Sequence, residues 1–255
     1  MVSETENEKW FNAASSGNLK EISKLIESGI QFNSKDKDGK SALILAAEKG
    51  HTDIVNFLLG VDSKKVLDLV LEWKNDEELC EKLAKQWKSH WIAVDINARD
   101  KTRKTALWYA VDGGHYETAK LLIDAGVDVN TYDLDDCTPL LIAVEKGYTE
   151  MAKWLIDAGA DVNISRRIIR KVGTGFTFSD DIYYYNEGGN SALISAVENG
   201  RVNLTRWLVK AGADVSVKDK YGETALEIAT SNKFYDIAEI LEKAKGNTLQ
   251  NTTTK

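Results

Sequence analysis

The sequence predicts an all-α repeat solenoid with one helical insertion and one extended β-hairpin insertion. The main observation is a seven-residue segment that returns along the chain as SALILAA, TALWYAV, TPLLIAV, SALISAV and TALEIAT. Thr105 and Thr138 start two copies 33 residues apart, and Ser191 and Thr224 start two more at the same spacing. A fixed period of this length is typical of stacked supersecondary units that bury their core between neighbours.

Each repeat follows the same order of local signals. A Ser or Thr opens it and can cap a helix with its side-chain oxygen. An apolar run follows, and then a glycine that can end the helix in the left-handed conformation. A second helical pattern comes next, as in 51–59 and 148–156, and a turn-rich loop completes the repeat. Such repeats are expected to start near residues 8, 41, 105, 138, 191 and 224.

These motifs resemble the ankyrin repeat, a helix-turn-helix plus a β-hairpin loop, over residues 8–245. The resemblance implies a protein without catalytic residues, whose partners dock on the loop tips and on the concave surface of the first helices. The family's histidine in its Thr-Pro-Leu-His motif is replaced at every copy, so its usual hydrogen bonding is not expected. Arg103 and Asp136 replace a loop glycine, and these two loops are therefore expected to be strained or differently shaped.

Composition limits the classes of partner and compartment. The formal net charge of −7 disfavours nucleic acid, because that binding depends on neutralising phosphates. The polar segment 1–7 lacks the features of a signal peptide, and no apolar run reaches the ~18 residues that span a membrane. Cys80 and Cys137 are expected to be free thiols, which fits a reducing cytoplasm. Segment 246–255 is polar and is expected to form a disordered tail.

A helical wheel separates the two sides of the first helix in the repeat that starts at Thr105. With about 100° per residue, Leu107, Ala110 and Val111 fall on one side, and Tyr109 and Asp112 fall on the opposite side. The first side is expected to face the core and the second to face a partner. Acidic residues recur at the position of Asp112, as Glu48, Glu145 and Glu198. They form either an acidic groove for a basic partner segment or an ordinary solvated helix face.

The first insertion, residues 60–94, reads as two amphipathic helices. It lengthens one repeat step to 64 residues, which is close to twice 33. The insertion is therefore either a degenerate repeat within the stack or a helical hairpin packed on it. Its tryptophans, Trp73, Trp87 and Trp91, are expected to supply core area, and any that is exposed would be a candidate contact.

The second insertion, residues 164–189, is predicted to be an elongated β-hairpin that extends the loop after Asn163. One arm is basic, the turn is Gly173-Thr174-Gly175, and the other arm is aromatic. The hairpin either packs on neighbouring loops or contacts a partner, and a short helix over 165–172 could form in place of its first arm. Its candidate partner-binding residues are Arg166, Arg167, Arg170, Lys171, Phe176, Phe178, Tyr183, Tyr184 and Tyr185.

The remaining polar residues form no site with recognisable chemistry. The three histidines and two cysteines have no metal-binding spacing, and no nucleophile motif is present, so no enzyme activity, metal or cofactor is expected. His51 and His115 share a repeat position and are expected to be structural. Asn130 and Asn163 resemble asparagines that are hydroxylated in ankyrin proteins of animal cells, but they are expected to stabilise their loops.

The sequence therefore predicts a non-catalytic, monomeric, cytoplasmic module that binds another protein. The expected contacts are Trp108, Tyr109, Asp112, Glu145 and the hairpin. A sharper form of this prediction is an inhibitor or immunity-type protein that blocks a partner enzyme or toxin. Two less favoured functions are single-stranded nucleic-acid binding through the basic and aromatic hairpin, and self-association through exposed tryptophans.

Overall fold

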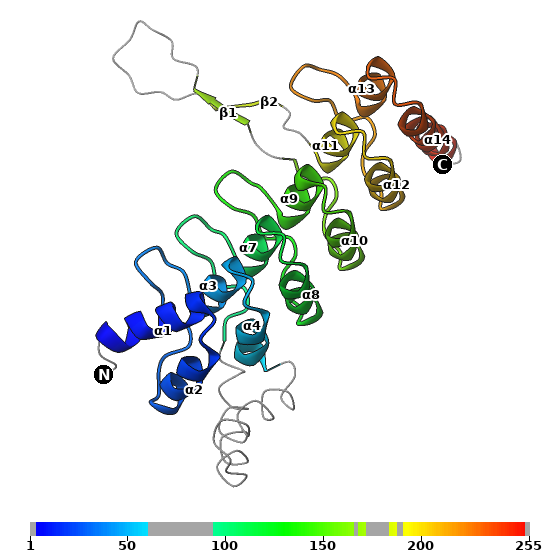
Figure 1. Ribbon diagram of the computed structural model, residues 1–255. Coiled ribbons are helices and arrows are strands. Elements are labelled where there is room, and N and C mark those ends of the chain that lie inside the picture. The colour runs from blue at the N-terminus through cyan, green and yellow to red at the C-terminus, as the bar shows by residue number, and fades with distance from the viewer. Residues whose placement is uncertain (1–3, 61–93, 166–167, 172–183, 188–190, 253–255) are drawn as a thin grey trace, which may run out of the picture. The chain divides into compact units, whose positions relative to one another are not determined.

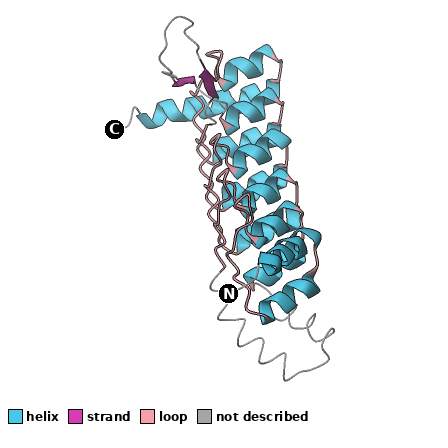
Figure 2. Ribbon diagram, turned by 90° about the vertical axis from the view of Figure 1, so that its left-hand side faces the viewer, coloured by secondary structure: helices cyan, strands magenta, loops and turns pink. Residues whose placement is uncertain are grey.

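The computed structural model describes residues 4–60, 94–165, 168–171, 184–187 and 191–252. The chain divides into two compact units, Met1–Thr131 and Tyr132–Lys255, which we call unit 1 and unit 2. Each unit consists of helix pairs stacked side by side, and the connecting loops project from one side of each pair (Figure 2).

Unit 1 contains three helix pairs among its described residues. The first helices pack against one another in the order α1, α3, α7, and α4 packs on α8 in the same direction (Figure 1). The helices are α1 (Glu4–Ser16), α2 (Leu19–Glu27), α3 (Ala42–Glu48), α4 (Thr52–Leu59), α7 (Ala106–Asp112) and α8 (Tyr116–Asp124).

The first insertion does not place a repeat between α3/α4 and α7/α8. Asn33 Oδ1 accepts a 2.9 Å hydrogen bond from the Asp95 amide, so the loop before α3 and the loop before α7 are direct neighbours. Since α3 also contacts α7 directly, the interpretation of the insertion as a degenerate repeat within the stack is wrong. Its two expected helices and three tryptophans lie outside the described residues.

Unit 2 contains three further helix pairs and a two-stranded antiparallel sheet in its described part. The strands pair in the register Ile168↔Glu187, Ile169↔Asn186, Arg170↔Tyr185 and Lys171↔Tyr184. The elements are α9 (Pro139–Lys146), α10 (Thr149–Asp157), β1 (Ile168–Lys171), β2 (Tyr184–Glu187), α11 (Ala192–Glu198), α12 (Val202–Lys210), α13 (Ala225–Ser231) and α14 (Tyr235–Thr252).

The sheet begins where an ordinary repeat has only a short loop. Ser165 and Ser191 form an isolated antiparallel bridge, and Lys218 and Thr224 form the same bridge at the equivalent positions of the next repeat. The extra residues therefore lie between two positions that remain adjacent. The helices that precede and follow the insertion, α9 and α11, therefore still pack directly against each other.

Side-chain caps fix where the first helices begin. In each of the five copies after the first, the hydroxyl of the opening Ser or Thr accepts from the backbone N–H three residues on, at 3.2 to 3.4 Å. Thr224 adds a reciprocal bond, because Glu227 Oε2 accepts from the Thr224 amide. The capping role predicted for these residues is confirmed.

On α7, the residues predicted to face the core are the buried ones. Leu107, Ala110 and Val111 are fully buried, whereas Tyr109 and Asp112 remain partly exposed. Burial between neighbouring helix pairs supplies the main stabilisation of such a solenoid.

An aspartate fixes each of four described loops that precede a first helix. Oδ1 of this residue accepts from the backbone N–H groups two and four positions on, as Asp36 does from Asp38 and Lys40 at 2.9 and 2.8 Å. Asp100, Asp133 and Asp219 repeat the pattern. Arg103 and Asp136 adopt φ of 67° and 55°, in the left-handed region that Gly39 occupies with φ of 82°. The loops therefore keep their shape, and the expected strain is present without a different geometry.

Polar side chains join successive repeats. His51 Nε2 lies 3.0 Å from the carbonyl oxygen of Ser15, and His115 Nε2 lies 3.1 Å from that of Glu48, so both histidines are structural as expected. Asn163 Oδ1 accepts from the Asp214 amide at 2.8 Å, which gives this asparagine its expected loop-stabilising role.

Candidate functional site

The exposed side of unit 1 carries a cluster of two aromatic rings and two lysines, which we call the inner-face cluster. Trp108 and Tyr109, on α7, meet edge to face with ring centroids 5.3 Å apart. Lys104 Nζ lies 3.9 Å from the Trp108 ring centroid, and Lys40 Nζ lies 4.3 Å from that of Tyr109. Both contacts have the geometry of cation–π interactions, so the lysines hold the rings in place.

Tyr109 connects this cluster to the preceding loop. Its hydroxyl donates a 2.7 Å hydrogen bond to Oδ2 of Asp100, whose residue is 8% exposed. Burial, followed by this bond to a carboxylate, raises the pKa of Tyr109 to about 12. Burial alone would raise the pKa of Asp100, but the hydrogen bonds from Tyr109, Thr102 and Lys104 together lower it.

Lys40 also engages the first acidic residue of the predicted row. Its Nζ forms a 2.7 Å ion pair with Glu48 Oε2. Burial alone would lower the pKa of Lys40, but the bond to Glu48 and the contact with Tyr109 raise it. Part of the acidic row is thus neutralised within unit 1.

In unit 2, the repeat position equivalent to Glu48 is occupied by two exposed acids, Glu145 on α9 and Glu198 on α11. Burial raises the pKa of Glu198, and the negative charges of Asp219 and Glu145 add to this effect while Lys220 opposes it. Glu145 and Glu198 therefore act on one another electrostatically, as two acids on adjacent helices would.

The structure places the predicted site residues in three groups. Trp108 is only 8% exposed, whereas Tyr109 and Asp112 are half-buried and Glu145 is exposed. Arg170 and Lys171 lie on β1 opposite Tyr185 and Tyr184 on β2. The remaining predicted residues, Arg166, Arg167, Phe176, Phe178 and Tyr183, lie outside the described residues.

Sequence reasoning missed Lys40, Lys104 and Asp100. A signal for them was present, because both lysines directly precede the helix-capping residues Ser41 and Thr105. Asp100 has equivalents at the same place in three other described loops. Comparing loop positions between repeats would have found all three.

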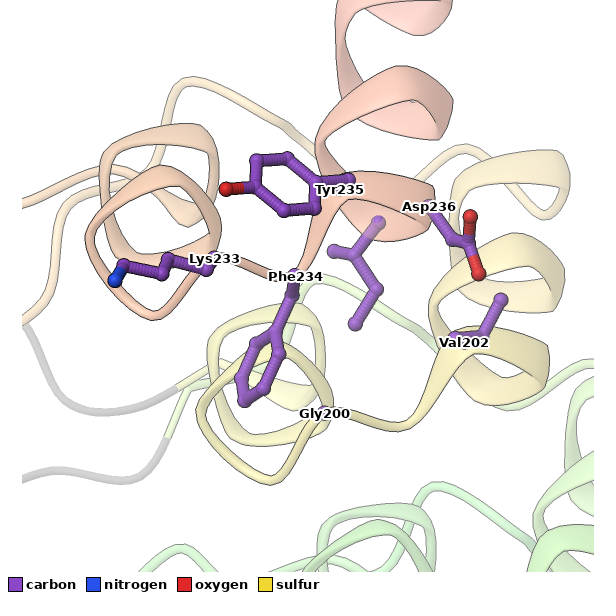
Figure 3. Close-up of a pocket in the computed structure, with 7 residues that line it drawn as sticks. Gly200, Val202, Lys233, Phe234, Tyr235 and Asp236 are labelled. Atoms are coloured by element: carbon purple, nitrogen blue, oxygen red, sulfur yellow. The ribbon is translucent and has the colours of Figure 1, made fainter.

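Pockets that lie among the described residues of unit 2 are shallow, and the two best formed gather no catalytic groups. The larger, about 270 Å³, is lined by Gly200, Val202 and residues 233–237. In Figure 3 the Phe234 ring lies against Gly200 while Tyr235 extends away from it.

Within the residues that the structure describes, no group of three His, Cys, Asp or Glu could hold a metal ion. No described helix is both long and apolar enough to cross a bilayer.

Comparison with known proteins extends these observations. The curated mitochondrial disaggregase of Bos taurus is 31% identical over 127 residues, which are 46% of this chain and 18% of that protein. The chain thus spans about a fifth of that relative's length, and the likeness concerns its repeats.

Solved structures share the fold along nearly the whole chain. An ankyrin repeat domain from Acinetobacter baumannii AYE has a TM-score of 0.68 at 21% identity, covering 92% of this chain and 97% of that one. A chain from a Bdellovibrio bacteriovorus predatory endopeptidase in complex with an immunity protein has a TM-score of 0.61 at 24% identity. That match covers 95% of this chain and 99% of the other.

Family models identify the repeats directly. The model described as ankyrin repeats (3 copies) matches residues 10–68 and 67–166, and that described as ankyrin repeats (many copies) matches residues 178–229. These segments cover most of the sequence and include the described helices from α2 to α12. The protein belongs to the ankyrin repeat family, whose repeats generally mediate protein–protein interaction and are typically non-catalytic.

Proposed function

We propose that this protein is a non-catalytic module that binds a partner protein through the inner-face cluster, the loop tips and the hairpin of residues 164–189. The observation that carries the proposal is the register of the hairpin. It pairs Arg170 with Tyr185 and Lys171 with Tyr184, so each of two basic positions on β1 lies opposite an aromatic position on β2.

The position of the hairpin supports this role. The bridge between Ser165 and Ser191 inserts it at a loop, which is the side from which partners of this family dock. A two-stranded hairpin is marginally stable in water by itself. Contact with a partner would supply the additional burial, and tyrosine and arginine are enriched among residues that dominate binding energy.

The inner-face cluster supports the same role in unit 1. Its rings are fixed by lysines and by the bond from Tyr109 to Asp100, so little side-chain entropy is lost when a partner binds. A cytoplasmic location and a monomeric state are parts of this proposal, and cell fractionation and light scattering test them.

The decisive experiment compares capture of the native partner by matched variants. The variant Tyr184→Ser/Tyr185→Ser removes the two tyrosines of β2 and is expected to lose most of the captured partner. Tyr235→Ser is the control, because this side chain is 74% exposed on α14 and belongs to none of the proposed surfaces. Tyr221→Ser, which changes a loop tip that is 72% exposed, measures the contribution of the loops. Equal capture by all four proteins would refute the hairpin as a contact.

A narrower form of the proposal is that the partner is an enzyme or toxin which this protein blocks. The observation that bears on it is the shared fold with a chain from the endopeptidase–immunity protein complex. If the captured partner is an enzyme, adding the purified protein should reduce its activity at a one-to-one ratio. An enzyme that stays fully active when saturated would rule out this narrower form.

A further inference from the structure

We propose that two neighbouring loops of unit 1 form a docking surface for an acidic segment of a partner protein. The loops are residues 35–40 and 99–104, and we call them the basic loop pair. This inference rests on the proposed function, since it names the chemistry of one contact made by the same binding module.

The two loops form one continuous surface. The Lys101 amide donates a 3.1 Å hydrogen bond to the carbonyl oxygen of Asp38, which joins their tips. Lys35 Nζ donates a 2.8 Å bond to the carbonyl oxygen of Arg99, which joins their bases. Each loop is also closed internally by the side chain of its first aspartate. The charges they carry are therefore held close together before any partner binds.

These loops are strongly basic in an acidic protein. Together they contain seven Lys and Arg residues and three Asp residues, a formal net charge of +4, whereas the whole chain carries −7. Two of the aspartates, Asp36 and Asp100, use Oδ1 to accept backbone N–H groups within their own loops. Their charge is turned toward the loop backbone, and the cations dominate the outer surface.

The fold of the loop does not require this charge. The equivalent loop of residues 132–137 contains three Asp residues and no cation, and that of residues 218–223 contains two cations and two acids. Both close with the same hydrogen-bond pattern from Asp133 and Asp219. The positive charge is thus a property of unit 1's loops and not of the turn geometry.

Two of the lysines are available to a partner. Lys37 and Lys101 are exposed, and neither has an ion-pair partner within the described part of the chain. Lys40 and Lys104 are occupied by the aromatic rings of the inner-face cluster, which lies directly behind them. A carboxylate that reaches Lys37 and Lys101 would gain charge-assisted hydrogen bonds without breaking an existing pair.

An acidic protein segment fits this surface better than a nucleic acid or a membrane. Single-stranded nucleic acids gain affinity by stacking bases on exposed rings. Here Trp108 is buried and lysines lie over both rings. Neither loop contains a large apolar residue that could insert into a bilayer.

The test is an NMR titration of the ¹⁵N-labelled full chain with a dodecapeptide of alternating Glu and Asp. Amide shifts are expected to concentrate in residues 35–40 and 99–104. Lys37→Glu/Lys101→Glu is expected to weaken binding by about tenfold or more. Lys20→Glu/Lys49→Glu is the control, because it makes the same change of net charge at exposed positions outside the loops and should bind nearly as the native protein does.

Three results would overturn the inference. The first is equal weakening by both charge-reversal variants, and the second is a map of shifts outside the two loops. The third is tighter binding of oligothymidylate or of phosphatidylserine vesicles than of the peptide at the same ionic strength. The variant Tyr184→Ser/Tyr185→Ser should keep full affinity for the peptide. A failure of the hairpin in partner capture is therefore separate from a failure of the basic loop pair.

Discussion

The hydroxyl of Tyr109 donates a 2.7 Å hydrogen bond to Oδ2 of Asp100, and this contact ties a first helix to the loop that precedes it. Oδ1 of the same carboxylate accepts from the Thr102 and Lys104 amides and from the Thr102 hydroxyl. Asp100 thus organises both the basic loop pair and the inner-face cluster. Its buried charge is satisfied on both oxygens.

Tyr109→Phe tests the strength of this link. The change removes one hydrogen bond to a charged group and should lower the free energy of unfolding by about 1.5 kcal/mol at neutral pH. Urea denaturation measures the effect. Tyr235→Phe is the control, because its exposed hydroxyl has no hydrogen bond in the described structure and its removal should change stability by less than about 0.5 kcal/mol.

The pH dependence of the same variant has a definite sign. Asp100 has a lowered pKa in the folded protein, so its contribution to stability is present above the ordinary value of 3.8 and is lost as the pH falls through the folded value. The difference between native protein and Tyr109→Phe should be constant near neutral pH and shrink below pH 3.8. A difference that does not change with pH would mean that Tyr109 acts through packing alone.

Lys233→Gly should stabilise the protein. Lys233 has φ of 61° and stands where other repeats have Gly147 and Gly200, with φ of 75° and 64°. Glycine adopts this conformation without strain, so the substitution should raise the free energy of unfolding by about 1 kcal/mol. Lys233→Ala is the matched control, because it removes the exposed side chain and leaves the backbone strain. Equal stabilities of the two variants would show that φ is not the cause.

Gly50→Ala should be more destabilising than Gly126→Ala. Both glycines have positive φ, of 70° and 80°, so each substitution should cost about 1 kcal/mol in backbone strain. A Cβ at Gly50 would lie 2.5 Å from Nδ1 of His115, whereas one at Gly126 meets nothing within 4 Å. The His115 ring is held by its contact with the Glu48 carbonyl oxygen, and displacing it should add about 1 kcal/mol or more.

A double-mutant cycle separates these two terms. In a His115→Ala background, Gly50→Ala should lose its additional cost and approach that of Gly126→Ala, as thermal melts would show. If Gly50→Ala costs the same with and without His115, the histidine ring does not restrict this position.

Local signals were sufficient to predict most of the fold. The caps at Ser41 and Thr105, the core position of Leu107 and the structural role of His115 depend on residues within one repeat or its neighbour. Such interactions recur at the repeat spacing, and the sequence therefore displays them several times. The left-handed residue Arg103 was also recognisable, because a glycine stands at its position in other loops.

Features that occur once were harder to predict. The first insertion nearly equals one repeat in length, so spacing alone could not show that α3 and α7 are direct neighbours. The inner-face cluster depends on Lys40 and Tyr109 meeting across 68 intervening residues, after the stack has formed. Among the five copies of the seven-residue segment, only the one that starts at Thr105 has two adjacent aromatic residues, Trp108 and Tyr109. The sequence therefore offers no second copy to compare.

Asn163 should contribute more to stability than other exposed asparagines. Its Oδ1 accepts from the Asp214 amide at 2.8 Å, and its Nδ2 donates to the Gly212 carbonyl oxygen at 3.2 Å, so one side chain joins consecutive repeats. Asn163→Ala removes both bonds and should lower the free energy of unfolding by about 1 to 2 kcal/mol. Urea denaturation of the full chain measures the loss.

Two further variants define the cause. Asn163→Asp keeps the acceptor for the Asp214 amide but replaces the donor to Gly212 by an oxygen, so it should fall between the native protein and Asn163→Ala. Asn203→Ala is the control, because Asn203 is exposed on α12 and makes no hydrogen bond with its side chain in the described structure. If Asn163→Ala proves no more destabilising than Asn203→Ala, the hydrogen bonds between these two loops are replaced by water at no cost, and the repeats are held together by their buried helices alone.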